Sequence, residues 1–135
     1  MLHIWLRPCS IGKNKKFMRS NKDTVWKIGE DAAREYLKDK EYEIIEQNYR
    51  DKYSEIDLIV KKNNVLIFVE VRTKTNRDFV SPEESINQKK LKKLYWNAEA
   101  YIANRKYKGQ SRIDAICIVL DVNNNVEKLE HYKGI

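Results

Sequence analysis

Apolar side chains recur every three or four positions between residues 23 and 40, which is the spacing of one face of an α-helix. The stripe consists of Val25, Ile28, Ala32, Tyr36 and Leu37. Asp23 or Thr24 can accept hydrogen bonds from the first unpaired N–H groups of such a helix. The pattern therefore predicts a helix over residues 23–40.

Three segments with the composition of β-strands follow this helix, at 42–50, 54–62 and 65–74. Asn63 and Asn64 separate the last two segments, and asparagine tolerates the positive φ angles of a tight hairpin turn. A hairpin closed at this point pairs residue 60 with residue 67 and residue 57 with residue 70. The pattern therefore predicts an antiparallel strand pair with a defined register.

A second helix is predicted from Pro82 to about Asn104, with Glu83 and Glu84 at its positive N-terminal end. A buried strand over residues 112–120 and a weaker strand over residues 126–133 follow. The resulting order, α-β-β-β-α-β-β, predicts an α/β fold in which helices flank one sheet.

One face of the third strand changes from apolar to charged halfway along its length. Residues two apart share a face of a strand. The changing face carries Leu66, Phe68, Glu70, Arg72 and Lys74, and the opposite face carries Ile67, Val69 and Val71. Charges are costly inside a sheet unless something compensates them. This strand therefore indicates a site at its charged end.

The second strand brings another carboxylate to the same end of the sheet. One of its faces carries Glu55, Asp57 and Ile59, and the other carries Ile56, Leu58 and Val60. The predicted hairpin places Asp57 opposite Glu70, and like charges in that arrangement are destabilising. A hard cation such as Mg²⁺ would resolve the conflict, because it prefers carboxylate and water oxygens. The alternative is an ion-pair cluster in which both acids pair with Arg72 and Lys74.

The net charge of +7 is unevenly distributed along the 135 residues. Residues 89–112 carry eight basic side chains and one acid, whereas residues 23–88 carry more acids than bases. A basic helix alone is most often a solvated face. An acidic site beside a basic segment, however, suits a polyanion that is handled together with a divalent cation.

Residues 1–22 carry six basic side chains, no acid and no apolar periodicity. We expect them to form a disordered extension of a single domain over residues 23–135, with a nucleic-acid-binding arm, or a true start at Met18, as alternatives.

The first residues do not resemble a signal peptide, and no apolar run approaches the roughly 20 residues needed to span a bilayer. A cytoplasmic protein that has no contact with a membrane is therefore expected. Cys9 and a packed Cys117 fit reduced thiols, and neither zinc nor disulfides are indicated.

Four short motifs occur in a fixed order, namely "GEDAAREYL" at 29–37, "SEIDLI" at 54–59, "FVEVRTK" at 68–74 and "SPEESINQKKLKKL" at 81–94. In order and spacing they resemble the YraN family of small bacterial proteins. That family is similar to restriction-endonuclease-like nucleases of the PD-(D/E)xK type and to Holliday-junction resolvases. The resemblance implies a restriction-endonuclease-like mixed sheet flanked by helices, and it covers about residues 25–120.

The resemblance also implies an active site, position by position. Asp57 and Glu70 match the two acids that hold the metal, which is Mg²⁺ or alternatively Mn²⁺. Glu30 matches a further acid of the site. Arg72 takes the place of the lysine in the motif, and arginine cannot deprotonate a water molecule because it stays protonated. It can still stabilise negative charge on a phosphate, and Lys74 on the same face is a substitute for the missing lysine.

Basic or polar residues of the second helix complete such sites in the family, and Gln88 and Lys89 are the candidates here. The side chains expected to hold nucleic-acid backbone are Lys74, Gln88, Lys89, Lys90, Lys92 and Lys93, with the stretch 105–112 beside them. Glu55, in contrast, is expected to form an ion pair at the sheet end.

Together these features predict a metal-dependent endonuclease that acts on DNA and selects by structure, because no sequence-recognition module is evident. One alternative is a nucleic-acid-binding protein with a degenerate nuclease site, which Arg72 would permit. Another is a protein-interaction scaffold with an ion-paired sheet end. Resolvase-like relatives act as dimers, so a homodimer is a further prediction, and Tyr95, Trp96 and Tyr101 fit either an interface or the core.

Overall fold

The computed structural model describes residues 21–52, 54–76 and 86–135. Its elements are α1 (Asn21–Asp39), β1 (Glu43–Arg50), β2 (Glu55–Lys62), β3 (Val65–Thr75), α2 (Gln88–Asn104), β4 (Gln110–Leu120) and β5 (Val126–Tyr132). The predicted α-β-β-β-α-β-β order is confirmed. Apart from the first two residues of α1, the predicted extension over 1–22 lies outside the described residues, as does Cys9. Within these ranges, no helix is long and apolar enough to cross a membrane.

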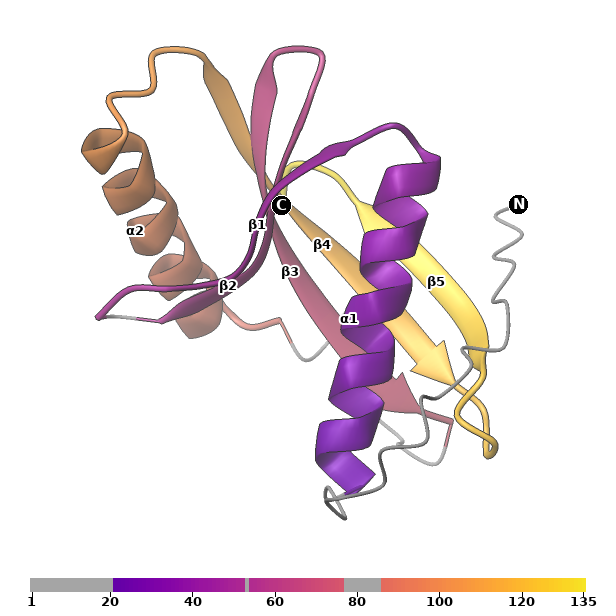
Figure 1. Cartoon of the computed structure of the whole chain (residues 1–135). Helices are drawn as coiled ribbons and strands as arrows, with labels where there is room; N and C mark the ends of the chain where they lie inside the picture. The colour runs from indigo at the N-terminus through magenta and orange to yellow at the C-terminus, as the bar shows by residue number, and fades with distance from the viewer. Residues whose placement is uncertain (1–20, 53, 77–85) are drawn as a thin grey trace, which may run out of the picture.

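The five strands form one mixed sheet in the order β1-β2-β3-β4-β5 (Figure 1). Neighbouring strands are antiparallel except β3 and β4, which are parallel and therefore need a crossover connection. That connection contains α2. The predicted hairpin is confirmed, because Asn63 and Asn64 have φ angles of 51° and 62° and Lys62 pairs with Val65.

The two helices cover opposite faces of the sheet (Figure 1). Ile67 and Val69 of β3 are buried in a cluster with residues of α1, whereas Leu66 and Phe68 are buried in a second cluster with residues of α2. This division confirms the predicted faces of β3. Tyr101 belongs to the core under α2, whereas Tyr95 and Trp96 are exposed, and Cys117 is buried as expected.

The predicted face of Ile56 is wrong. Strict alternation places it with Leu58 and Val60 on the α1 side, but it is buried on the α2 side with Ile59. The alternation breaks at Asp57. The side chain of Asp57, instead of a backbone carbonyl of β2, accepts a hydrogen bond from the Val71 backbone N–H. The strand rotates there, and the rotation brings Ile56 under α2.

The predicted start of α2 is also too early, because residues 86 and 87 are not helical and residues 82–85 lie outside the described ranges. Asn87 is the N-cap, with φ −100° and ψ 169°, and its side chain accepts the backbone N–H of Lys90. The first turn therefore consists of Gln88, Lys89 and Lys90. No acid lies in that turn, so the positive helix end carries lysines.

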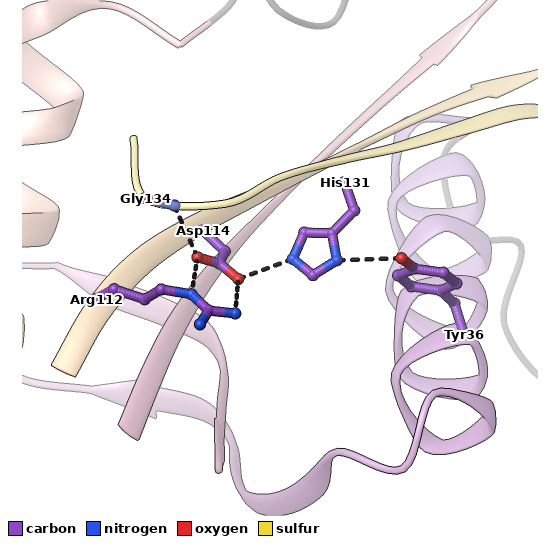
Figure 2. Close-up of polar contacts among 5 residues, drawn as sticks. All are labelled: Tyr36, Arg112, Asp114, His131 and Gly134. Atoms are coloured by element: carbon purple, nitrogen blue, oxygen red, sulfur yellow. Dashed lines mark hydrogen bonds and ion pairs between the residues drawn. The ribbon is translucent and has the colours of Figure 1, made fainter. Parts of the chain in front are cut away.

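A hydrogen-bonded network joins β4, β5 and α1 (Figure 2). The fully buried Asp114 carboxylate accepts hydrogen bonds from Arg112 Nε at 2.9 Å, His131 Nε2 at 2.8 Å and the Gly134 backbone N–H at 3.0 Å. The other ring nitrogen of His131 is hydrogen-bonded to the Tyr36 hydroxyl at 3.1 Å. The network attaches the last strand of the sheet to the first helix.

Candidate functional site

The candidate site lies where the described pairing of β2 with β3 ends. The hairpin register reaches Leu58 opposite Val69. One position further on, the Asp57 carboxylate accepts a hydrogen bond from the Val71 backbone N–H at 2.7 Å. The same register places Glu70 across from Asp57, and the two carboxyls are only 5% and 9% exposed, respectively. Two acids thus meet at a buried sheet end.

Glu30 reaches the same point from α1 because Gly29 precedes it. A Cβ atom at residue 29 would overlap the Thr73 side chain, so glycine is needed for α1 to lie this close to β3. Glu30 is consequently buried and shares a hydrogen bond with Asp57. We call Glu30, Asp57 and Glu70 the carboxylate cluster.

The carboxylate cluster is electrostatically crowded. Burial raises the pKa of Asp57 well above its usual range, and the charge of Glu70 raises it further, although the Val71 N–H acts in the opposite direction. Burial likewise raises the pKa of Glu30, and its hydrogen bond with Asp57 offsets part of that rise. A proton shared between Asp57 and Glu30 agrees with the raised pKa of both groups, because neighbouring carboxylates cannot all ionise without a compensating cation.

Glu70 has cationic partners from two elements. Lys90 Nζ of α2 lies 2.8 Å from Glu70 Oε1, and Arg72 Nη1 of β3 lies 3.6 Å from the same oxygen. The helix contact to Glu70 therefore comes from Lys90 rather than from Gln88 or Lys89. Among the described residues, ion pairs reach Glu70 but not Asp57. The ion-pair alternative thus applies to one of the two acids.

The types of side chain in the carboxylate cluster limit which metal ion could bind there. In the described ranges, no three His, Cys, Asp or Glu side chains stand together in a metal-ligand arrangement. Mg²⁺ needs fewer protein ligands, because it commonly takes one or two carboxylates and completes its shell with water and substrate phosphate. Asp57 and Glu70 match that requirement. A zinc ion does not fit, since the carboxylate cluster contains no His or Cys.

Two adjoining hollows form a cleft at Asp57 and Glu70, with volumes of about 600 Å³ and about 530 Å³. Both are lined by Trp26, Asp57, Glu70 and Lys90. The first hollow extends along β3 past Arg72, Thr73 and Lys74. The second extends along α2 past Asn87, Lys89 and Lys93. The cleft therefore combines acids on one wall with cations from both sides.

The predicted phosphate-binding residues divide into two groups. Lys74, Lys89, Lys90 and Lys93 line the cleft, whereas Gln88 and Lys92 are exposed on α2 outside its described lining. The stretch 105–112 is partly structural. Arg105 pairs with Glu46 at 2.6 Å, and Arg112 is bound to Asp114.

The sequence motifs do not single out Asn48, although it borders the carboxylate cluster. With its amide nitrogen turned toward the acids, as its hydrogen-bond partners require, that nitrogen lies 3.1 Å from both Glu30 and Glu55. Its φ of 51° in a strand is the local signal of an unusual role. Glu55 also pairs with Arg50 at 3.2 Å, as predicted.

Comparison with known sequences adds to this geometry. The family described as "Uncharacterised protein family UPF0102" matches residues 29–118. The chain belongs to UPF0102. This is the YraN family that the motifs resemble, and it is restriction-endonuclease-like. The UPF0102 match begins at Gly29, and it includes the carboxylate cluster, Arg72 and all of α2.

Several UPF0102 relatives match most of the chain. A UPF0102 protein of Persephonella marina is 45% identical over 101 residues, which are 74% of this chain and 84% of the relative. One from Caldanaerobacter subterraneus is 40% identical over 113 residues, 82% of this chain and 93% of the relative. One from Thermotoga maritima is 36% identical over 110 residues, 82% and 94% of the two chains.

Proposed function

We propose that this UPF0102 protein is a metal-dependent endonuclease that acts on DNA and selects its substrate by structure rather than by sequence. The observation that supports the proposal is the position of Asp57 and Glu70 in a cleft lined by lysines, with Glu30 buried beside Asp57. Buried acids with strongly raised pKa values are typical of functional sites. A cytoplasmic location belongs to the same proposal, because that is where bacterial DNA lies.

Asp57 and Glu70 would hold the metal, Mg²⁺ or alternatively Mn²⁺. When bound, the ion would neutralise phosphate charge and make water at the site more acidic. Glu30 would position Asp57, because the two carboxyls share a hydrogen bond. This contact would hold the Asp57 carboxyl at the sheet end.

Arg72 and Lys90 would act on the phosphate. Arg72 stays protonated, so it can stabilise negative charge but cannot accept a proton. Lys90 brings a second positive charge to the same place from α2. Its contact with Glu70 suggests that α2 supplies the lysine that the motif lacks at position 72. Lys74, Lys89 and Lys93 would then hold neighbouring phosphates.

A second candidate function is nucleic-acid binding without cleavage. The ion pairs of Glu70 with Lys90 and Arg72 favour it, because they already compensate one of the two acids. Such a protein would bind DNA equally well in EDTA and in Mg²⁺, and Asp57→Asn would not weaken binding. A homodimer remains a prediction under either function.

The deciding experiment is cleavage of labelled branched, flap, single-stranded and duplex DNA in Mg²⁺, in Mn²⁺ and in EDTA. We expect wild type to cut in either metal but not in EDTA, and Glu70→Gln to abolish cutting. Glu99→Gln is the matched control, because Glu99 is an exposed acid on α2 outside the described lining of the cleft. Its cleavage rate should equal that of wild type.

Other outcomes of this experiment separate the two candidate functions. If wild type is inert and Arg72→Lys cuts, the site is intact and Arg72 silences it. If neither protein cuts but both bind DNA with a steep salt dependence, binding without cleavage replaces the nuclease. If Glu70→Gln cuts like wild type, the carboxylate cluster is not the active site.

A further inference from the structure

Trp26 is a large aromatic side chain beside the carboxylate cluster that the proposed reaction does not use. It lines both hollows of the cleft, together with Asp57, Glu70 and Lys90. The side chain is 43% exposed. A tryptophan with this much exposed surface in a concave, charged site offers part of its ring to a ligand, and aromatic residues in such places are typical of ligand contacts.

The local fold holds Trp26 in this place. Trp26 and Glu30 are four residues apart on α1, so they lie on the same side of the helix, one turn from each other. Gly29 brings this turn against Thr73 of β3, where a Cβ atom would not fit. The indole is therefore carried by a helix that is fixed against the sheet, which limits the conformational freedom that a ligand would have to restrict.

The surroundings of Trp26 match the two parts of a nucleotide. Lys90 lies between the hollows, with Arg72 and Lys74 in the first hollow and Lys89 in the second. These cations suit phosphates, whereas the face of an indole suits a nucleobase, which stacks on aromatic side chains in single-strand-binding proteins. Within a continuous duplex each base is already stacked on both sides. The ring can therefore receive only a base that has left the stack or never belonged to one.

We propose that Trp26 is the stacking platform for an unpaired nucleobase, and that the cleft takes DNA with an unpaired nucleotide next to the target phosphodiester. This inference rests on the proposed function and names its substrate class: single-stranded DNA, or the single-stranded part of a branched molecule, rather than continuous duplex. Trp26 precedes the residues of the UPF0102 match.

Trp96 provides an internal control for the stacking role. It is also a tryptophan on a helix and is more exposed than Trp26, at 57%. It belongs to α2, which carries the cleft lysines, but it is not among the described residues that line either hollow. A general contribution of exposed aromatic rings to DNA binding would involve both tryptophans, whereas a stacking site in the cleft involves Trp26 alone.

The test measures binding of a short labelled DNA strand by fluorescence anisotropy, in EDTA and again in Mg²⁺ with a phosphorothioate strand that resists cleavage. We expect Trp26→Ala to weaken single-strand binding about tenfold or more, Trp26→Phe to recover most of it and Trp96→Ala to change it by less than about twofold. The affinity for blunt duplex should be nearly the same in all four proteins. Equal urea midpoints confirm that each variant is folded.

A strand with an abasic nucleotide supplies the second readout. If stacking is the cause, abasic substitution at the bound position should weaken binding to wild type but not to Trp26→Ala. Equal single-strand affinities of wild type and Trp26→Ala overturn the stacking platform, and metal-dependent cleavage that persists in both proteins leaves the nuclease standing. If wild type binds neither strand nor duplex in either buffer, both proposals fail.

Discussion

Asp114 of β4 and Asp57 of β2 are both aspartates buried in the same sheet, but their surroundings differ. Asp114 accepts hydrogen bonds from Arg112, His131 and a backbone N–H. Asp57 accepts one backbone N–H and otherwise faces Glu70 and Glu30. The pKa of Asp114 is accordingly lowered, whereas that of Asp57 is raised.

The difference separates an acid that serves the fold from one that, as we propose, serves a ligand. Burial penalises the charged form of both side chains. For Asp114 the chain supplies the compensating donors, so the folded protein is complete without any other molecule. For Asp57 the neighbouring side chains add negative charge instead. A site that is left destabilised in this way is a common cost of function, and an external cation would remove that cost.

The largest expected effect compares Asp114→Asn with Asp57→Asn. The first change turns an amide N–H₂ toward the donors of Arg112 and His131, and breaking a buried pair of this kind costs about 3–5 kcal/mol. The second keeps an acceptor for the Val71 N–H and removes a crowded carboxyl, so it should change the free energy of unfolding by about 1 kcal/mol or less. Urea unfolding in EDTA measures both values. A greater loss in Asp57→Asn would contradict the division of roles.

An intermediate effect is expected from Mg²⁺. A ligand that binds only the folded state adds about 2.7 kcal/mol of stability at 100 times its dissociation constant. Wild type and Asp114→Asn should both show a rise in Tm as MgCl₂ is added at constant ionic strength, whereas Asp57→Asn and Glu70→Gln should not. Thermal unfolding followed by circular dichroism provides the measurement. The absence of any rise in wild type would remove the metal from the proposed mechanism.

The smallest expected effect is the acid dependence that Asp114 confers. Burial alone would raise its pKa, but the hydrogen bonds from His131 and Arg112 outweigh burial and lower it. As the pH falls, the Asp114 carboxyl is therefore protonated at a higher pH in the unfolded chain than in the folded protein. The stability that Asp114 contributes is complete above about pH 4 and is lost as the pH falls through the lower native pKa.

The measurement for this prediction is the free energy of unfolding of wild type minus that of Asp114→Asn, followed from about pH 6 to about pH 2. The difference should narrow only at the acid end of the range. A difference that narrows as the pH rises would contradict the lowered pKa.

The parts of the fold that depend on local patterns were predictable. Strand alternation placed Leu66 and Phe68 on one face of β3, and two asparagines specified the hairpin turn, because both signals act over a few residues. The errors occur where one side chain overrides the pattern. The Asp57 carboxylate takes the place of a backbone carbonyl in the pairing of β2 with β3, and Ile56 lies on the other face from the predicted one. The Asn87 side chain caps α2, so this helix begins later in the chain than Pro82 predicts.

The composition of the site was only partly predictable for a related reason. Alternation and spacing brought Asp57 and Glu70 together, but contacts between distant elements leave no periodic trace. The ion pair between Lys90 of α2 and Glu70 of β3, for example, joins residues 20 positions apart, and from the sequence Lys90 was expected only to hold nucleic-acid backbone. Asp114 and His131 are 17 residues apart, and no motif joins them. Gly29 was the available hint, because a glycine inside a strong helix often marks a close approach.

The cleft draws its side chains from α1, β2, β3 and the crossover helix α2, and this has a consequence for folding kinetics. The β2–β3 hairpin can form early because its contacts are local, but the parallel pairing of β3 with β4 must first close the connection across residues 76–109. Lys90 lies within that connection. A chain that has formed only its hairpin therefore holds Asp57, Glu70 and Arg72 without the lysines of α2, so the assembled cleft is one of the last features to appear as the protein folds.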